Sequence, residues 1–219
     1  MKKPICTIVG MGPGVSYAVA KRFAREGFAI AMIARNAAKL DNYRQQMQAA
    51  GFEAYGFPAD AADFTQLASA FRHLKSQLGN IEVLVYNVSI FREAAPTQLN
   101  PDVLVEDFKA DAAGLLVAVQ QVVDTMRSRK QGTILITGGG QALQPYYLLS
   151  SLAAGKAALR ALSYCLHDEL RSYGIRVATI TINGQVSPGG RFDPDRISET
   201  YWELYTAGSE SFKKEIIYQ

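Results

Sequence analysis

Short apolar runs alternate along the chain with longer stretches in which apolar residues recur every three or four positions. The short runs predict buried strands, and the longer stretches predict amphipathic helices. The predicted strands are 5–9, 29–34, 53–57, 83–87, 134–137 and 176–182, and the predicted helices are 15–26, 37–50, 63–78, 100–129, 148–173 and 194–207. Strands that are apolar throughout are typical of a parallel sheet covered by helices on both faces.

The pattern therefore predicts an α/β fold of the Rossmann type, a doubly wound parallel sheet in three α/β/α layers. Turn and cap residues agree with these limits: Gly27, Gly51 and Gly174 follow three of the helices, and Asp63 precedes another with Gln66 three residues on. We expect one domain over residues 1–219. The last 35 or so residues fit the pattern least well, and we interpret 188–219 as a short C-terminal tail or substrate lid.

Composition narrows the functional classes. The chain has 219 residues, of which 48% are hydrophobic, and a formal net charge of only +3. Without a Lys/Arg cluster this charge does not indicate a nucleic-acid partner, and no apolar run approaches the ~20 residues that span a bilayer. Cys6 and Cys165 are too few for a disulfide framework, which favours reduced thiols and a cytoplasmic location. His73 and His167 have no partner ligands, so we predict no metal site.

A glycine-rich loop joins the first predicted strand to the first predicted helix. It contains Gly10, Gly12 and Gly14 and continues into the helix at Val15 and Ser16. Glycines allow close approach of the backbone to a diphosphate, and a helix N-terminus offers free N–H groups and a partial positive charge. We therefore predict a dinucleotide site here; the alternative is an ordinary glycine-rich turn.

The end of the second strand bears on which dinucleotide binds. It reads Ala34-Arg35-Asn36, with no acidic residue before Asp41. An NAD site usually places a carboxylate here for the ribose 2′-hydroxyl, whereas the 2′-phosphate of NADP requires a cation. Arg35 therefore favours NADP(H), although NAD(H) stays possible if Arg35 is only a solvated rim residue. Asp60, after the third strand, is suited to a hydrogen bond with adenine; the alternative is that it is only a turn residue.

With this loop, Asp60, Asn87 after the fourth strand and Lys156 in a long helix, the chain resembles the short-chain dehydrogenase/reductase family from about Pro4 to Ser187. The resemblance implies a nicotinamide cofactor held also by Asn87, Lys156, Gln185 and Ser187. The chain departs from the family motifs at several positions: Val9 replaces the first Thr of the loop, and Ser16 replaces its last Gly.

The largest departures concern catalysis. The family uses an Asn, a Ser and a Tyr-x-x-x-Lys pair, whose Lys lowers the phenol pKa and positions the ribose. Here Lys156 is kept, but Leu152 stands four residues before it, Gly139 in the serine position and Asp111 in the asparagine position. We consider Lys156 and Asp111 as the catalytic candidates. Asp111 is either a substitute acid or an ion-pair partner of Lys156.

Two functional classes remain. The first is an NADP(H)-dependent oxidoreductase with a rewired proton supply and a small apolar or aromatic substrate, in a pocket that includes Gly139, Tyr147, Leu152 and Trp202. The second is a catalytically inactive sensor or partner protein that binds the dinucleotide. For Trp202 the alternative is a helix that packs against the domain. In the family, helices equivalent to 100–129 and 148–173 form subunit interfaces, so the resemblance implies a homodimer or homotetramer.

Overall fold

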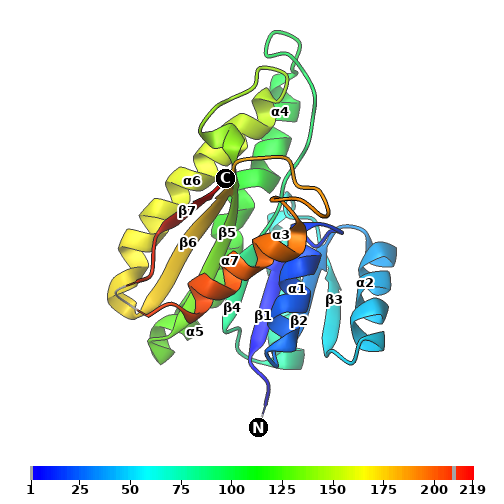
Figure 1. Cartoon of the computed structure of the whole chain (residues 1–219), viewed down its shortest axis with the longest axis vertical. Coiled ribbons are helices and arrows are strands. Elements are labelled where there is room, and N and C mark those ends of the chain that lie inside the picture. The colour runs from blue at the N-terminus through cyan, green and yellow to red at the C-terminus, as the bar shows by residue number, and fades with distance from the viewer. Residues whose placement is uncertain (1, 209–210) are drawn as a thin grey trace.

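A seven-stranded parallel sheet forms the middle layer of the protein (Figure 1). The computed structural model describes residues 2–208 and 211–219. The strands lie in the order β3-β2-β1-β4-β5-β6-β7, and every pairing is parallel. Their bounds are Ile5–Val9 (β1), Ala29–Ala34 (β2), Ala54–Pro58 (β3), Val83–Tyr86 (β4), Gly132–Gly139 (β5), Ile175–Ile182 (β6) and Glu215–Tyr218 (β7). The predicted Rossmann-type fold in one domain is confirmed.

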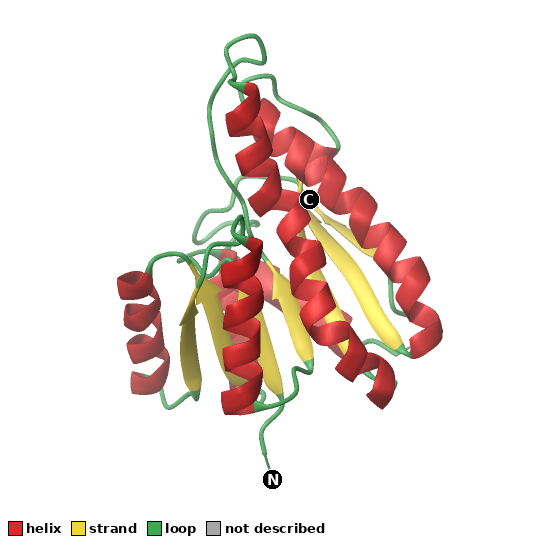
Figure 2. Ribbon diagram, turned by 180° about the vertical axis from the view of Figure 1, so that it is seen from behind, coloured by secondary structure: helices red, strands yellow, loops and turns green. Residues whose placement is uncertain are grey.

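Helices cover both faces of this sheet. One face is covered by α1 (Val15–Arg25), α2 (Ala37–Ala49) and α7 (Pro194–Thr206), which pack with it into one apolar cluster (Figure 1). The other is covered by α3 (Phe64–Leu78), α5 (Gly114–Arg129) and α6 (Ser150–Leu170), which form a second cluster (Figure 2). The two clusters explain why the inner strands carry no polar alternation, since both faces are buried.

The predicted continuous helix over 100–129 is wrong in its middle. Helix α4 (Pro101–Phe108) and α5 are joined by a π-helical turn at Lys109–Ala113. The hydroxyl of Tyr86, buried beneath this turn, donates a hydrogen bond to the carbonyl of Ala110. A single inserted residue of this kind keeps the 3.6-residue period on either side but shifts the later positions by about 100°, and such turns are frequent at functional sites.

Most of the described part of the C-terminal tail forms a helix and a strand of the three-layer fold. Helix α7 packs against α1, and β7 adds the last strand beside β6. Glu215 in β7 accepts hydrogen bonds from Arg160 and Thr181, which fixes the strand to its neighbours. The interpretation of 188–219 as a lid therefore does not fit α7 or β7, whereas the loop 183–193, which follows β6, lies at the carboxyl end of the sheet. No described helix is long and apolar enough to cross a membrane.

Candidate functional site

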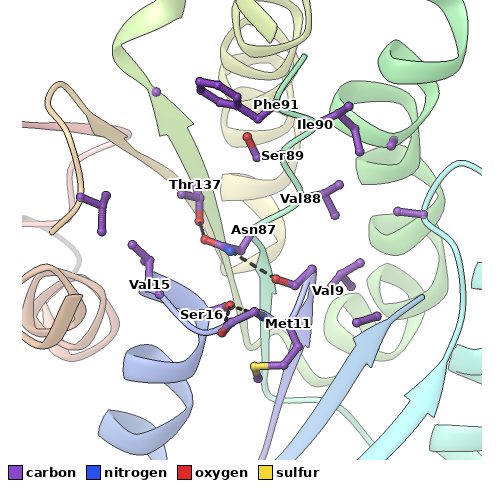
Figure 3. A pocket seen from close by; sticks show the side chains of 18 of the residues that line it. Val9, Met11, Val15, Ser16, Asn87, Val88, Ser89, Ile90, Phe91 and Thr137 are labelled. Carbon is purple, nitrogen blue, oxygen red and sulfur yellow. Dashed lines mark hydrogen bonds between the residues drawn. The ribbon is translucent and has the colours of Figure 1, made fainter. Parts of the chain in front are cut away.

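A cleft of about 1400 Å³ lies along the carboxyl ends of the strands. Its walls come from the loops after β1, β2, β3, β4, β5 and β6. Strand β1 lies between β2 and β4, so successive strands are added first on one side of β1 and then on the other. This is the switch point of the sheet, where ligands of doubly wound folds bind. Figure 3 shows the centre of the cleft.

The glycine loop occupies the end of the cleft nearest β1. Gly10 has a φ of +88°, and a Cβ atom there would lie 2.8 Å from the backbone of Asn87, so only glycine fits. A Cβ on Gly14 would meet no atom within 4 Å. Helix α1 begins at Val15, and its N-cap Gly14 has no side chain to cap it. Helices α2, α3, α4 and α7 are each capped by a side chain, and α5 and α6 are not. Uncapped N–H groups at the open end of a helix suit an anion.

Ser16 stabilises the loop from within. Its hydroxyl accepts a hydrogen bond from the Gly12 N–H at 2.8 Å and donates one to the Gly12 carbonyl at 3.2 Å. The residue is only 1% exposed. A dinucleotide would therefore contact Ser16 through its backbone, because the hydroxyl is already engaged on both sides.

Cations gather at the end of β2. Arg35 is exposed, and its Nη1 lies 3.8 Å from Oδ2 of Asp60, a loose ion pair. Asn36 caps α2 by accepting from the Lys39 N–H at 2.9 Å, so its side chain has a structural role. Lys39 and Tyr43, which the sequence analysis did not identify, also line the cleft. Their positions in the sequence could have identified them, because both lie on the first turns of the helix that follows Arg35. We call Gly10–Ser16 with Arg35 and Lys39 the glycine-loop end of the cleft.

Asn87 is held in the middle of the cleft by a chain of hydrogen bonds (Figure 3). Its Nδ2 donates to the Gly10 carbonyl at 3.3 Å, and its Oδ1 accepts from the Thr137 hydroxyl at 2.7 Å. The Thr137 and Tyr201 hydroxyls are 2.7 Å apart, and Tyr201 must be the donor because Thr137 donates to Asn87. Burial raises the pKa of Tyr201, which keeps its proton in place. Asn87 thus joins the glycine loop to β5.

Lys156 lies in the floor of the cleft and is 4% exposed. Its Nζ donates to the carbonyls of Val88 at 2.9 Å and Thr137 at 3.1 Å. Burial lowers its pKa to about 8, with the negative charge of Asp111 opposing this shift. A Cβ on Gly139 would lie 3.7 Å from the Lys156 side chain, an ordinary contact distance. The position therefore has room for a small side chain that this protein lacks.

Asp111 is fully buried in the π-helical turn. Its Oδ1 accepts from the Ile90 N–H at 2.7 Å, and its Oδ2 has no hydrogen-bond partner among the described residues. Burial raises its pKa to about 6, opposed by Lys156. A Cβ on Gly155 would lie 2.6 Å from the Asp111 Cβ, so that glycine makes room for the acid. Within the described part of the chain no ion pair of 4 Å or less joins Asp111 to Lys156, so the direct pair is not formed.

At the other end of the cleft the apolar side chains of Phe91, Leu149 and Leu152 form part of the lining. Polar residues, among them Ser89, Gln141 and Gln144, also line the cleft. Two hydrogen bonds hold the loops after β4 and β5 side by side: Ala94 N–H donates to the Leu148 carbonyl at 2.8 Å, and the Ser150 hydroxyl donates to the Ala94 carbonyl at 3.2 Å. We call the part of the cleft bordered by Phe91, Gln141, Leu149 and Leu152 the apolar end.

Three predicted site residues lie elsewhere. Tyr147 is 60% exposed and packs on Tyr146 outside the cleft, because the loop after β5 turns outward there. Trp202 packs on Phe23 and Phe28, since α7 directs Tyr201 inward and Trp202 toward α1. Ser187 is exposed and does not line the cleft, although Gln185 does. For Trp202 the structure therefore favours the packing alternative.

Sequence comparisons agree with this architecture. A family model described as short chain dehydrogenase matches residues 4–188. The chain is 29% identical over 172 residues to 2,3-dihydro-2,3-dihydroxybenzoate dehydrogenase of Bacillus subtilis, covering 78% of this chain and 66% of that protein. It is 31% identical over 178 residues to a very-long-chain 3-oxoacyl-CoA reductase of Aspergillus niger, covering 79% of this chain and 51% of that protein. The chain thus spans between half and two thirds of these two relatives.

Solved structures share the fold. A metagenomic short-chain oxidoreductase in complex with NADP superimposes with a TM-score of 0.90 at 21% identity, over 99% of this chain and 97% of that one. An alcohol dehydrogenase from Thermococcus sibiricus complexed with 5-hydroxy-NADP gives a TM-score of 0.88 at 20% identity, over 100% of this chain and 98% of that one.

Proposed function

Because the chain belongs to the short-chain dehydrogenase family, we propose that it is an oxidoreductase that binds NADP(H) and supplies protons without a catalytic tyrosine or serine. The observation that carries this proposal is the uncapped N-terminus of α1, which opens on the glycine-loop end of a cleft whose floor holds a buried lysine. Bound there, the nicotinamide ring supplies or accepts a hydride.

The residues present fit this cofactor. The open space over Gly14 and the free N–H groups of α1 suit the diphosphate. Arg35 and Lys39 suit a 2′-phosphate, since two cations stand at the end of β2 and the loose Arg35–Asp60 pair leaves the guanidinium exposed. Lys156 would face the ribose. These features favour NADP(H) over NAD(H), and the complexes of the two structural neighbours with NADP and 5-hydroxy-NADP are consistent with that preference.

Proton supply rests on Lys156. Among the described residues that line the cleft, the titratable side chains are Arg35, Lys39, Tyr43, Asp60 and Lys156, and the first four come from the β2–β3 side. A pKa of about 8 keeps the Lys156 ammonium able to donate near neutral pH. Asp111 does not line the cleft, so we assign it a role through the charge of Lys156 and not through contact with substrate.

A second candidate is a protein that binds the dinucleotide without turnover. Leu152 and Gly139 favour it, because neither side chain can donate or accept a proton where the family places its tyrosine and serine. A positioned acid–base group typically contributes ~10²–10⁴-fold in rate. Orientation of donor and acceptor contributes more, about 7–11 kcal/mol, and the intact cleft still provides for it.

Calorimetric titration with NADPH and NADH tests the first step, and we expect tighter binding of NADPH. NADPH oxidation with a panel of carbonyl, imine and activated-alkene compounds then separates the two candidates. Turnover that disappears in Lys156→Ala while NADPH still binds supports the oxidoreductase. Tight NADPH binding without turnover across the panel supports the binder. Absence of heat with both nucleotides contradicts both candidates.

A further inference from the structure

Tyr201 is a buried phenol whose hydroxyl reaches from α7 to β5, near the carboxyl end of that strand. Its side chain is fully buried, and it packs with Ile197 and Leu204 in the apolar cluster under α7. A buried phenol needs a hydrogen-bond partner, because an unpaired hydroxyl in apolar surroundings costs free energy. The Thr137 hydroxyl, 2.7 Å away, is the partner that the described residues provide. A phenylalanine would fill the same apolar space, so packing alone does not explain the hydroxyl.

The direction of the hydrogen bonds beyond Tyr201 is fixed from their far end. The Gly10 carbonyl can only accept, so the Asn87 atom that lies 3.3 Å from it is the NH₂ group. The Asn87 oxygen therefore faces Thr137, whose hydroxyl donates to it and accepts from Tyr201 (Figure 3). Every donor thus points from α7 toward the glycine loop. We call Tyr201, Thr137 and Asn87 the Tyr201–Asn87 chain.

The Tyr201–Asn87 chain lies on the side of the glycine loop opposite to Arg35. Strand β1, which leads into the glycine loop, lies between β2, which Arg35 follows, and β4, which Asn87 follows. A dinucleotide with its 2′-phosphate near Arg35 and its diphosphate at the glycine loop would extend its other half toward β4 and β5. Asn87 and Thr137 both line the cleft there. The chain therefore fixes a side chain on the nicotinamide side of the cleft.

Thr137 also joins this chain to Lys156. Its carbonyl oxygen accepts from the Lys156 Nζ at 3.1 Å, while its hydroxyl contacts Asn87 and Tyr201. Gly10 is the fixed end of the arrangement, because its N–H donates to the Ile33 carbonyl at 2.9 Å. A displacement of Thr137 would therefore move both Asn87 and Lys156 relative to the glycine loop.

We propose that Tyr201 is a positioning residue for the nicotinamide half of the dinucleotide. Its hydroxyl holds Thr137, Thr137 holds the amide oxygen of Asn87, and Gly10 holds the amide nitrogen, so the Asn87 side chain keeps one orientation in the cleft. Tyr201 does not line the cleft and acts only through Thr137. The inference rests on the proposed binding of NADP(H), and it adds Tyr201 and Thr137 to the residues on which that binding depends.

Calorimetry on the full-length protein tests this role with two ligands, NADP⁺ and adenosine 2′,5′-bisphosphate, which lacks the nicotinamide half. Thr137→Val removes the hydroxyl with little change of shape, Thr137→Ser keeps it, and Tyr201→Phe removes only the phenol hydroxyl. Thr179→Val and Tyr86→Phe are the matched controls, because their buried hydroxyls donate to backbone carbonyls and do not line the cleft. Urea unfolding of every variant measures the accompanying loss of stability.

We expect Thr137→Val to weaken NADP⁺ binding about tenfold and Tyr201→Phe about threefold, since Thr137 can still donate to Asn87 in the second variant. The double variant should match Thr137→Val, because Tyr201 acts only through Thr137. Binding of adenosine 2′,5′-bisphosphate should change less than about twofold in all three. Thr137→Ser and both controls should bind NADP⁺ like the wild type.

Equal weakening of the two ligands in Thr137→Val would indicate a general loss of structure and overturns the proposal. So does wild-type binding of NADP⁺ by Tyr201→Phe, or weakening of the same size in the controls. If Thr137→Val does not fold, Tyr201→Phe alone decides the outcome. A wild type that binds neither ligand contradicts the proposed function and this inference together, whereas binding of both ligands without the expected difference between them contradicts this inference alone.

Discussion

The two ends of the cleft are built from different parts of the polypeptide. The glycine-loop end depends on backbone: a left-handed glycine, a loop closed on itself by Ser16 and the free N–H groups of α1. The apolar end depends on side chains, and we infer that Leu152 and Gly139 stand there in the positions of the family's tyrosine and serine. A ligand that is held by backbone groups requires only that the loop keeps its conformation, so this kind of binding tolerates side-chain substitutions. Side-chain chemistry is lost with a single substitution. The same fold thus keeps its cofactor cleft while its acid–base groups change.

Restoring the missing side chains is the strongest test of this contrast. We predict that Leu152→Tyr combined with Gly139→Ser raises the rate of ketone reduction with NADPH by ~10²–10⁴-fold, the usual contribution of a positioned acid–base group. Serine fits at position 139, because its Cβ would lie 3.7 Å from Lys156. Leu152→Phe with Gly139→Ser is the control, since it supplies the ring without the hydroxyl. An equal gain in both double variants would show that ring packing, and not the phenol, was missing.

Substitutions in the glycine loop should separate folding from binding. A Cβ at Gly10 would collide with Asn87 at 2.8 Å in a backbone conformation with φ +88°, so Gly10→Ala should lower the free energy of unfolding by about 2–4 kcal/mol. Gly14→Ala meets no atom within 4 Å and should unfold like the wild type while binding NADPH more weakly. Urea unfolding and calorimetry measure the two effects. Equal stability loss in both variants would contradict a specific clash at Gly10.

The sequence predicted the layers because each inner strand is apolar throughout and each helix has its stop or cap residue. It did not predict β7, a four-residue edge strand whose residues are partly exposed and whose Glu215 accepts hydrogen bonds from Arg160 and Thr181, which are distant in the sequence. It also missed the π-helical turn, because the helical period is the same in the segments before and after it and only the phase shifts, by about 100°. The residues of the glycine loop could be identified from the order of the glycines between the first predicted strand and the first predicted helix. The role of Thr137 could not, because it arises from a contact between β5 and the loop after β4 that only the folded sheet brings together.

The buried pair of charges makes stability depend on pH in a predictable direction. Asp111 has a pKa raised to about 6 from 3.8, so the folded protein binds more protons between these values and stability rises as pH falls through that window. Lys156 has a pKa lowered to about 8 from 10.5, so stability rises as pH increases from 8 to 10.5. The contribution of the pair is therefore smallest between about pH 6 and 8.

Asp111→Asn should remove the acidic branch of this profile. We expect it to raise the free energy of unfolding at pH 7 by about 1–2 kcal/mol, because a buried charge with an unpartnered oxygen is removed, and to flatten the profile between pH 4 and 6. Urea titrations at half-unit pH steps provide the measurement. Asp124→Asn, at an exposed position of α5 where no ion pair is found among the described residues, is the control and should leave the profile unchanged. Persistence of the acidic branch in Asp111→Asn would mean that another group causes it.

The smallest predicted effect concerns the exposed edge of the glycine-loop end, where a side chain and not the backbone selects the ligand. Arg35→Ala should weaken NADPH binding about five- to tenfold and leave NADH binding unchanged, since a solvated guanidinium contributes only one charge-assisted contact to a 2′-phosphate. Arg44→Ala, on the helix that follows Arg35 but paired with Asp41 and absent from the cleft, is the matched control. Calorimetry with both nucleotides measures the ratio. If Arg35→Ala weakens the two nucleotides equally, Arg35 acts through Asp60 and the adenosine and not through the phosphate, and cofactor choice must then reside in Lys39.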